Sequence, residues 1–225
     1  KAFLEAGIHV ACEKPLCFTV EQAEELQALA AEKNLFFAVI YTYTGYAMVK
    51  LAKELVEKGE IGEIVNVNAE YLQDWLIDEI GGGSQTTTKL SVWRTDPEKS
   101  GISNCVGDIG THIEDTVSYI TGLHPKKVAA ALDNYGMELD LNANMLVEYE
   151  NGVHGVYSCS QVCAGHLNGL TVRIFGTKGA IEWVQEDPNY LKVTKKGTAG
   201  ADIPQRNRIY NRACSRTESH SFRPS

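Results

Sequence analysis

The segment Val106–Asp115 constrains the fold of this chain most strongly, because it combines apolar and ionisable residues at helical spacing. It places Asp108, His112 and Asp115 at positions i, i+4 and i+7. If the segment is helical, these side chains lie on one face. A neighbouring apolar stripe can bury against a sheet and consists of Ile109, Ile113, Val117 and Ile120. We therefore predict a sheet-packed helix that holds an imidazole beside carboxylates, an arrangement suited to proton transfer near neutral pH.

The start of the chain has the pattern of a strand–helix–strand (βαβ) unit. The apolar run Ile8–Cys12 predicts a strand that leads directly into Glu13-Lys14-Pro15. Thr19-Val20-Glu21-Gln22 matches a capping box, so a helix should begin there and end at about residue 33. The unbroken apolar run Leu35–Ile40 is typical of a parallel strand that is covered on both faces. This order of elements predicts a parallel pair of strands.

Beyond a second helix, predicted over Ala47–Lys58, the apolar period changes to two. The residues that share one face of the next predicted strand are Val65, Val67, Ala69 and Tyr71. Residues 76–104 predict a long loop, and Asn151-Gly152 is the strongest hairpin signal in the chain. Further strands are predicted over residues 127–132, 143–150, 153–161, 170–175, 180–185 and 190–194. We therefore expect a mostly antiparallel meander with a helix on one face.

Charge and composition exclude two classes of partner. The net charge of −8 leaves no basic excess to neutralise phosphates, so we expect no nucleic-acid partner. The longest apolar run, Leu35–Tyr41, is too short to span a bilayer, so we expect no membrane partner. The 6 cysteines include no C-x-x-C pair and are too sparse for a disulfide scaffold. They predict reduced thiols in a cytoplasmic protein.

Three motifs together resemble those of the Gfo/Idh/MocA oxidoreductases. They are Cys12-Glu13-Lys14-Pro15 after a strand, Trp93-Arg94 in a loop, and Gly107-Asp108-Ile109-Gly110-x-His112-x-x-Asp115 on a helix. The resemblance covers about residues 1–195. It implies hydride transfer between a nicotinamide cofactor, NAD or NADP, and a hydroxyl or carbonyl carbon of a small molecule. A sugar or a polyol is the substrate class that the resemblance implies.

The same resemblance assigns roles to individual residues. The catalytic set is Lys14, Asp108 and His112: His112 acts as the base, Asp108 orients it or contacts the substrate, and Lys14 steadies the developing oxyanion. The residues expected to bind the cofactor are Glu13, Lys14, Pro15, Trp93 and Arg94. Substrate binding falls to Tyr43, Asp108, His112 and Asp115. Pro15 fixes the turn that aims Lys14 and allows a cis peptide bond before it.

The fold class that follows is α/β (α+β), in three parts. Residues 1–44 form a remnant of a Rossmann-type parallel sheet, the end of a dinucleotide-binding domain. Residues 45–200 form an α/β substrate and oligomerisation domain with a large, mainly antiparallel sheet, and residues 201–225 an irregular tail. No G-x-G-x-x-G fingerprint occurs in the sequence. We expect that fingerprint to precede Lys1, because Lys1–Gly7 has the pattern of the end of a helix.

Two other functions stay open at this point. Asp108 and His112 have the i, i+4 spacing of a shared metal site, but no convincing third ligand lies nearby, so we expect no metal. The chain is also compatible with a cofactor-free sheet domain that acts only in binding or oligomerisation. For the oxidoreductase as for these alternatives we expect a homo-oligomer, because antiparallel sheets with an open face often pair.

Overall fold

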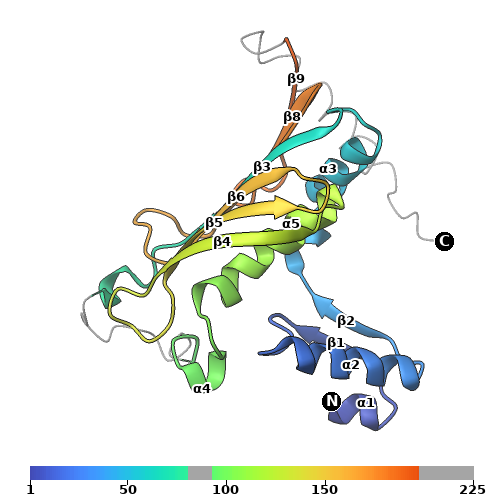
Figure 1. Cartoon of the computed structure of the whole chain (residues 1–225), viewed down its shortest axis with the longest axis vertical. Helices are drawn as coiled ribbons and strands as arrows, with labels where there is room; N and C mark the ends of the chain where they lie inside the picture. Colours follow the sequence, from blue (N-terminus) through green and yellow to red (C-terminus); the bar gives the residue numbers. More distant parts are fainter. Residues whose placement is uncertain (81–92, 198–225) are drawn as a thin grey trace, which may run out of the picture.

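Strands β1 (Val10–Glu13) and β2 (Phe37–Ile40) confirm the predicted βαβ unit in the computed structural model, which describes residues 1–80 and 93–197. The two strands pair in parallel, with Val10 opposite Phe37. Helix α2 (Val20–Glu32) joins them, and the short helix α1 (Ala2–Glu5) precedes them. Figure 1 shows this N-terminal unit beside the larger remainder of the chain.

Two local predictions in this unit are confirmed. The Thr19 side chain accepts a hydrogen bond from the Gln22 amide, and the reciprocal bond completes the capping box. Gly7 follows α1 with φ +80°, the left-handed conformation expected of the residue after a helix. One prediction is wrong: β2 is not covered on both faces, since Ile40 is 42% exposed. Both helices of the unit lie on the same side of its two strands, and no helix of the described residues covers the other side (Figure 1).

The rest of the described chain is built on a seven-stranded sheet in the order β4-β5-β6-β3-β7-β8-β9. Every pairing in it is antiparallel except that of β3 with β6. The mainly antiparallel sheet is therefore confirmed, but the simple meander is wrong, because β3 is inserted at the centre. The strands are β3 (Ile64–Leu72), β4 (Pro125–Asp133), β5 (Asn142–Tyr149), β6 (His154–Ser160), β7 (Gly169–Gly176), β8 (Gly179–Val184) and β9 (Leu191–Lys195).

Strand β3 departs from its predicted face at one residue. Val67, Ala69 and Tyr71 are buried as predicted, whereas Val65 is 54% exposed. The register of β3 against β7 shifts between Ile64 and Asn66, which marks a bulge or irregularity. A bulge changes the side to which the following residues point, and therefore strict alternation fails at Val65.

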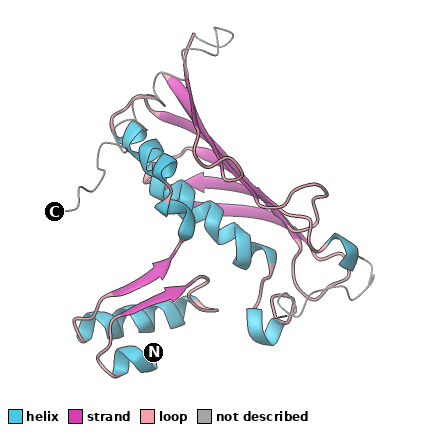
Figure 2. Cartoon of the chain, turned by 180° about the vertical axis from the view of Figure 1, so that it is seen from behind, coloured by secondary structure: helices cyan, strands magenta, loops and turns pink. Residues whose placement is uncertain are grey.

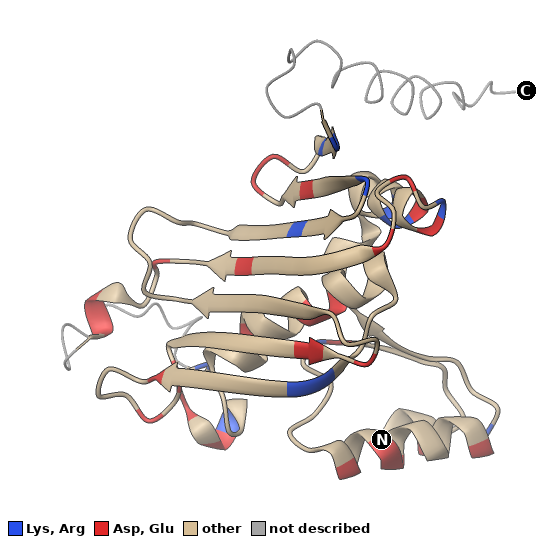
Figure 3. Cartoon of the chain, turned by 45° about the horizontal axis from the view of Figure 1, so that its top comes forward, with Lys and Arg blue, Asp and Glu red and all other residues tan. Residues whose placement is uncertain are grey.

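Helices α3 (Ala47–Glu57) and α5 (Thr111–Thr121) pack on one face of this sheet (Figure 2). The predicted apolar stripe of α5 is buried, with Ile113 and Val117 at 0% exposure. Burying an aliphatic side chain of this size contributes about 1.5–3 kcal/mol. The opposite face of the sheet carries no helix among the described residues (Figure 3). This one-sided cover fixes α5, and with it the candidate site, against the inner sheet face.

The connections follow the sequence closely. Asn151-Gly152 turns β5 into β6, and Gly152 has φ +82°. The predicted long loop contains a 3₁₀ helix η2 (Ile77–Glu79) and a short helix α4 (Pro97–Ser100), while residues 81–92 lie outside the described part. The predicted tail, 201–225, also lies outside it. None of the helices in the described ranges has the length and apolar character needed to cross a membrane.

Candidate active site

The segment that carries Asp108 is a π-helical turn, η3 (Val106–Gly110), and α5 begins only at Thr111. The Thr111 amide donates to the Val106 carbonyl, five residues back, which is the π pattern. A π turn holds more residues than an α turn, so Asp108 is rotated away from its predicted position. As a consequence Asp108 and Asp115 do not share one face: they line two different cavities.

Gly110 lets this turn approach the sheet closely. A Cβ atom added there would lie 3.4 Å from the Cys159 Sγ of β6 and 3.1 Å from the Val106 side chain. The latter distance is tighter than ordinary van der Waals contact. The glycine therefore brings the backbone of the turn against β6, where a larger residue would push it outward.

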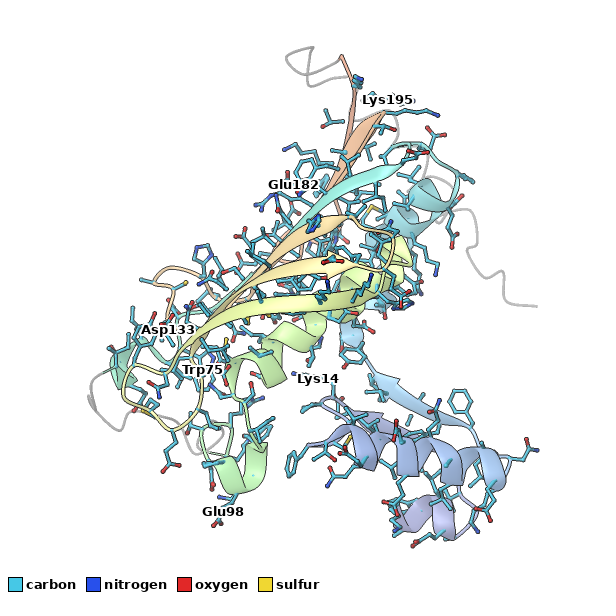
Figure 4. All side chains as sticks on the ribbon, viewed as in Figure 1. Lys14, Trp75, Glu98, Asp133, Glu182 and Lys195 are labelled. Atoms are coloured by element: carbon cyan, nitrogen blue, oxygen red, sulfur yellow. The ribbon has the colours of Figure 1, made fainter. Side chains whose placement is uncertain are left out.

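Lys14 reaches across from the N-terminal unit to Asp108. Its Nζ donates to the Asp108 carbonyl oxygen at 2.6 Å and to Oδ1 at 2.8 Å. The two side chains are only 15% and 17% exposed, so water screens this ion pair little. Figure 4 shows Lys14 on the side of the N-terminal unit that faces the large sheet. The Lys14–Pro15 peptide bond is cis.

The predicted cofactor-binding residues line one cavity of about 210 Å³. They are Glu13, Lys14, Pro15, Trp93 and Arg94, and Asp108 closes the same cavity. The Arg94 guanidinium stacks on the Trp93 ring at 4.5 Å, and its Nε lies 3.4 Å from Asp108 Oδ2. Residues from the N-terminal turn, the loop and the π turn are thus brought together, as the motifs predicted. Their binding role stays a prediction.

His112 follows on the first turn of α5 and is 8% exposed. Its ring meets the Tyr43 ring edge-on, with centroids 4.7 Å apart, and its Nδ1 has no hydrogen-bond partner. Burial, and secondly the charge of Lys14, lower the pKa of His112 to about 4, while Asp108 opposes this effect. The imidazole is therefore neutral at pH 7. Among the described residues no hydrogen bond joins it to the Asp108 carboxylate, which binds Lys14 instead.

Tyr43 belongs to a buried hydroxyl network beside His112. Its Oη lies 2.5 Å from the Tyr71 Oη, and the Asn168 side chain bonds to both tyrosines. Burial, and then the neighbouring Tyr43, raise the pKa of Tyr71. The network holds the Tyr43 ring against the imidazole and forms a rigid wall on this side of the site.

Asp115 occupies different surroundings from those predicted. It lines a second cavity, of about 470 Å³, with Tyr41 and the strand residues Val128 and Met145. Its Oδ2 is buried without a hydrogen-bond partner. Burial, and secondly the adjacent Glu114, raise the pKa of Asp115 to about 6. Its assignment to substrate binding stays a prediction.

Sequence patterns missed three polar residues behind Asp108. Gln161 donates to Asp108 Oδ2, the Asn104 side chain donates to Gln161, and Asp140 accepts from the Asn104 backbone amide. Gln161 could have been found, because it continues the inward alternation of Tyr157 and Cys159 and is polar where an apolar residue is expected. Nothing comparable marks Asn104 in the sequence. In the described ranges no group of three or more histidine, cysteine or acidic residues is arranged to hold a metal ion.

The structure contains a parallel βαβ unit that presents Lys14 to Asp108, beside His112 on a sheet-packed helix, which is the arrangement that the resemblance to oxidoreductases implied. Residues 1–41 match the oxidoreductase family with an NAD-binding Rossmann fold. Residues 49–182 match the Gfo/Idh/MocA C-terminal domain. The chain belongs to the Gfo/Idh/MocA family of oxidoreductases.

Individual relatives agree with this assignment. An uncharacterised oxidoreductase of Bacillus subtilis is 36% identical over 211 residues, which cover 90% of this chain and 52% of the relative. Levoglucosan dehydrogenase of Pseudarthrobacter phenanthrenivorans is 29% identical over 217 residues, which cover 85% of this chain and 53% of that enzyme. The crystal structure of an inositol dehydrogenase homolog from Azotobacter vinelandii, complexed with NAD+, aligns with a TM-score of 0.81 and 34% identity. The alignment covers 87% of this chain and 50% of the homolog. The chain spans about half the length of the curated relatives it matches.

Proposed function

We propose that the protein carrying this chain transfers a hydride between NAD or NADP and a hydroxyl or carbonyl carbon of a sugar, polyol or similar small molecule. The observation that carries this proposal is the contact of Lys14 with Asp108, beside the buried, neutral His112. The substrate class is supported by similarity to levoglucosan dehydrogenase and to the inositol dehydrogenase homolog. In this proposal residues 1–44 end a dinucleotide-binding domain, 45–200 carry the substrate, and 201–225 form a tail.

The cavity beside Lys14 has the chemistry that a nicotinamide needs. Trp93 supplies an aromatic surface, and the Arg94 and Lys14 cations line the same cavity. Planar rings pack well on aromatic side chains, and cationic donors suit the carboxamide and phosphate oxygens of a dinucleotide. When bound, the cofactor accepts or donates the hydride at C4 of its ring.

His112 is the group to which we assign proton transfer. In the oxidative direction the substrate hydroxyl loses its proton as its carbon loses a hydride. The imidazole is neutral at pH 7, so one of its two ring nitrogens can accept that proton. The negative charge of Asp108 favours the imidazolium that results. In the reductive direction the same proton returns to the developing alkoxide.

Lys14 and Asp108 have the complementary task. The Lys14 ammonium can donate to the substrate oxygen as negative charge develops on it, and a fixed cation needs no reorganisation at that moment. Asp108 holds the ammonium through two acceptors, its carbonyl and Oδ1. We propose that Tyr43 and Asp115 border the bound substrate. Tyr43 packs on the His112 imidazole, and Asp115 lies one turn further along α5.

Turnover tests this proposal directly. The protein expressed from its natural gene is mixed with NAD or NADP and a panel of sugars and polyols, and the absorbance of the reduced cofactor is followed. We expect reduction with at least one substrate and a rise in nicotinamide fluorescence when reduced cofactor binds. Absence of both binding and turnover across the panel would favour the cofactor-free binding module instead.

We further propose that the protein is a cytoplasmic homo-oligomer that pairs through its bare sheet face. Leu146 and Val156 lie opposite each other there and are 64% and 43% exposed. Charges on the same face neutralise one another, since Arg173 pairs with Glu70 at 3.0 Å. Free cysteines in the described ranges agree with a reducing compartment. Leu146→Lys should lower the mass measured by light scattering, and an unchanged oligomer would exclude this face.

A further inference from the structure

The Asp108 carboxylate has a second anchor that the proposed reaction does not use. Its Oδ2 accepts a hydrogen bond from Gln161 Nε2 at 3.0 Å, while its Oδ1 accepts from Lys14. Gln161 directly follows β6 and is 0% exposed. The backbone of Gln161 is fixed as well, because its amide donates to the Leu141 carbonyl at 2.9 Å. The carboxylate is therefore held from both sides.

Asn104 determines which way the Gln161 amide points. The Asn104 Nδ2 donates to Gln161 Oε1 at 2.6 Å and to the Asp140 carbonyl at 3.2 Å. An amide NH₂ group can only donate, so the Gln161 oxygen must face Asn104. The Gln161 NH₂ group must then face Asp108, which can only be an acceptor at Oδ2. A reversed Gln161 amide would bring two oxygens together.

Asp140 anchors this arrangement to the π turn. Its two carboxylate oxygens accept from the backbone amides of Asn104 at 2.9 Å and of Val106 at 2.8 Å. Asn104 is 1% exposed and Asp140 is 7% exposed. Buried hydrogen bonds to a charged acceptor are short and strong, so Asn104 and the first residue of the π turn are tied to one group.

We propose that Gln161 is a positioning residue, which keeps the Asp108 carboxylate aimed at Lys14, and that Asn104 and Asp140 hold Gln161 in the orientation this requires. The inference rests on the proposed function for its purpose, since a fixed Asp108 keeps the Lys14 ammonium at the reacting oxygen. Without the Gln161 donor, Oδ2 keeps, among the described residues, only the longer contact with Arg94 Nε at 3.4 Å. The carboxylate can then rotate about its side-chain torsions and release Lys14 from Oδ1 for part of the time.

The chemical reactivity of the Lys14 amine tests this inference without any measurement of turnover. Trace acetylation with acetic anhydride, followed by mass spectrometry of the peptides, gives the modification rate of Lys14 relative to that of Lys53 in the same molecule. We expect Gln161→Met to raise this ratio by about threefold or more, and Asp108→Asn to raise it further. Gln27→Met is the matched control, because Gln27 is exposed on α2, and it should leave the ratio unchanged.

An unchanged Lys14 ratio in Gln161→Met overturns the inference, and so does an equal rise in the rates of Lys14 and Lys53, because that reports general loosening. If Gln161→Met does not fold, Gln161→Glu combined with Asp108→Asn decides the question. This exchange keeps one donor and one carboxylate in contact, so its midpoint of thermal unfolding should exceed that of either single variant. A midpoint below both single variants contradicts the contact.

Turnover supplies a separate readout. Gln161→Met should lower kcat by about tenfold with an unchanged KM for the cofactor, because Asp108 then supports Lys14 less in the transition state. If the unmodified protein has no turnover, the proposed function fails, whereas the labelling result still decides the role of Gln161. The two failures are therefore distinguishable.

Discussion

The Lys14 amine donates to both the backbone carbonyl and the carboxylate of Asp108, 94 residues further along the chain. Lys14 follows a strand of the N-terminal parallel pair, and Asp108 lies in the π turn before α5. One ion pair therefore joins the two units at the point where the predicted catalytic residues meet. Its low exposure lets it position groups for chemistry more effectively than a surface pair could.

His112→Asn should lower kcat by about 100-fold while cofactor affinity stays the same. Asparagine is close to the imidazole in size but cannot accept the proton at neutral pH. Steady-state kinetics with the best substrate of the panel, together with a fluorescence titration of reduced cofactor, measure the two quantities. His154→Asn, at an exposed position of β6, is the control. Full turnover of His112→Asn would remove the imidazole from the mechanism.

Asp115→Asn should make the protein more stable above about pH 6 and not below about pH 4. Burial raises the pKa of Asp115 from 3.8 to about 6 in the folded state. A carboxyl group with a raised folded pKa contributes its stability at low pH and loses it as the pH rises through the folded value. The gain of the variant should therefore appear between about pH 4 and pH 6, and should reach on the order of 1 kcal/mol after allowance for partial exposure.

Urea unfolding of the unmodified protein and of Asp115→Asn measures that gain. The unfolding is followed at about pH 4, 5, 6 and 7, which covers the range over which the Asp115 carboxyl group titrates. A constant difference between the two proteins at every pH would mean that Asp115 titrates normally. Its carboxyl group would then be well solvated, contrary to the buried and unpartnered Oδ2.

Tyr71→Phe should reduce the free energy of unfolding by about 1–2 kcal/mol. The substitution removes a hydroxyl that bonds to Tyr43 and Asn168 in the buried wall beside His112. Tyr135→Phe is the comparison, because Tyr135 is 40% exposed, and its loss should stay below about 0.5 kcal/mol. Equal effects of the two substitutions in denaturant unfolding would show that the tyrosine network adds nothing to stability.

Local patterns predicted much of this fold because each is fixed by neighbouring residues. The Thr19 capping box, the Asn151-Gly152 hairpin and the apolar stripe of α5 depend on side chains within one or two turns of one another. The grouping of Lys14, Trp93 and Arg94 with Asp108 could be predicted only from the resemblance of the three motifs to a family, since no local rule joins residues so far apart.

Other features depend on contacts that spacing does not encode. The π turn at Asp108 changes the helical period that placed Asp115 on the same stripe, and the sequence gives no sign of the extra residue. The central place of β3 arises from its parallel pairing with β6, a non-local choice. Gln161, Asn104 and Asp140 act through long-range hydrogen bonds, so only the fold brings them to Asp108.

The convergence of Lys14, Asp108 and His112 on one reaction centre can be measured without a substrate, by following the titration of the His112 ring protons by NMR. The pKa of His112 depends on the charges of Lys14 and Asp108 and on burial. We expect a pKa of about 4 for His112 in the unmodified protein, a higher value in Lys14→Met and a lower value in Asp108→Asn. Lys50→Met, at an exposed position of α3, should leave it unchanged. A pKa near the ordinary 6.5 that responds to neither Lys14 nor Asp108 would contradict the convergence of these residues on one reaction centre.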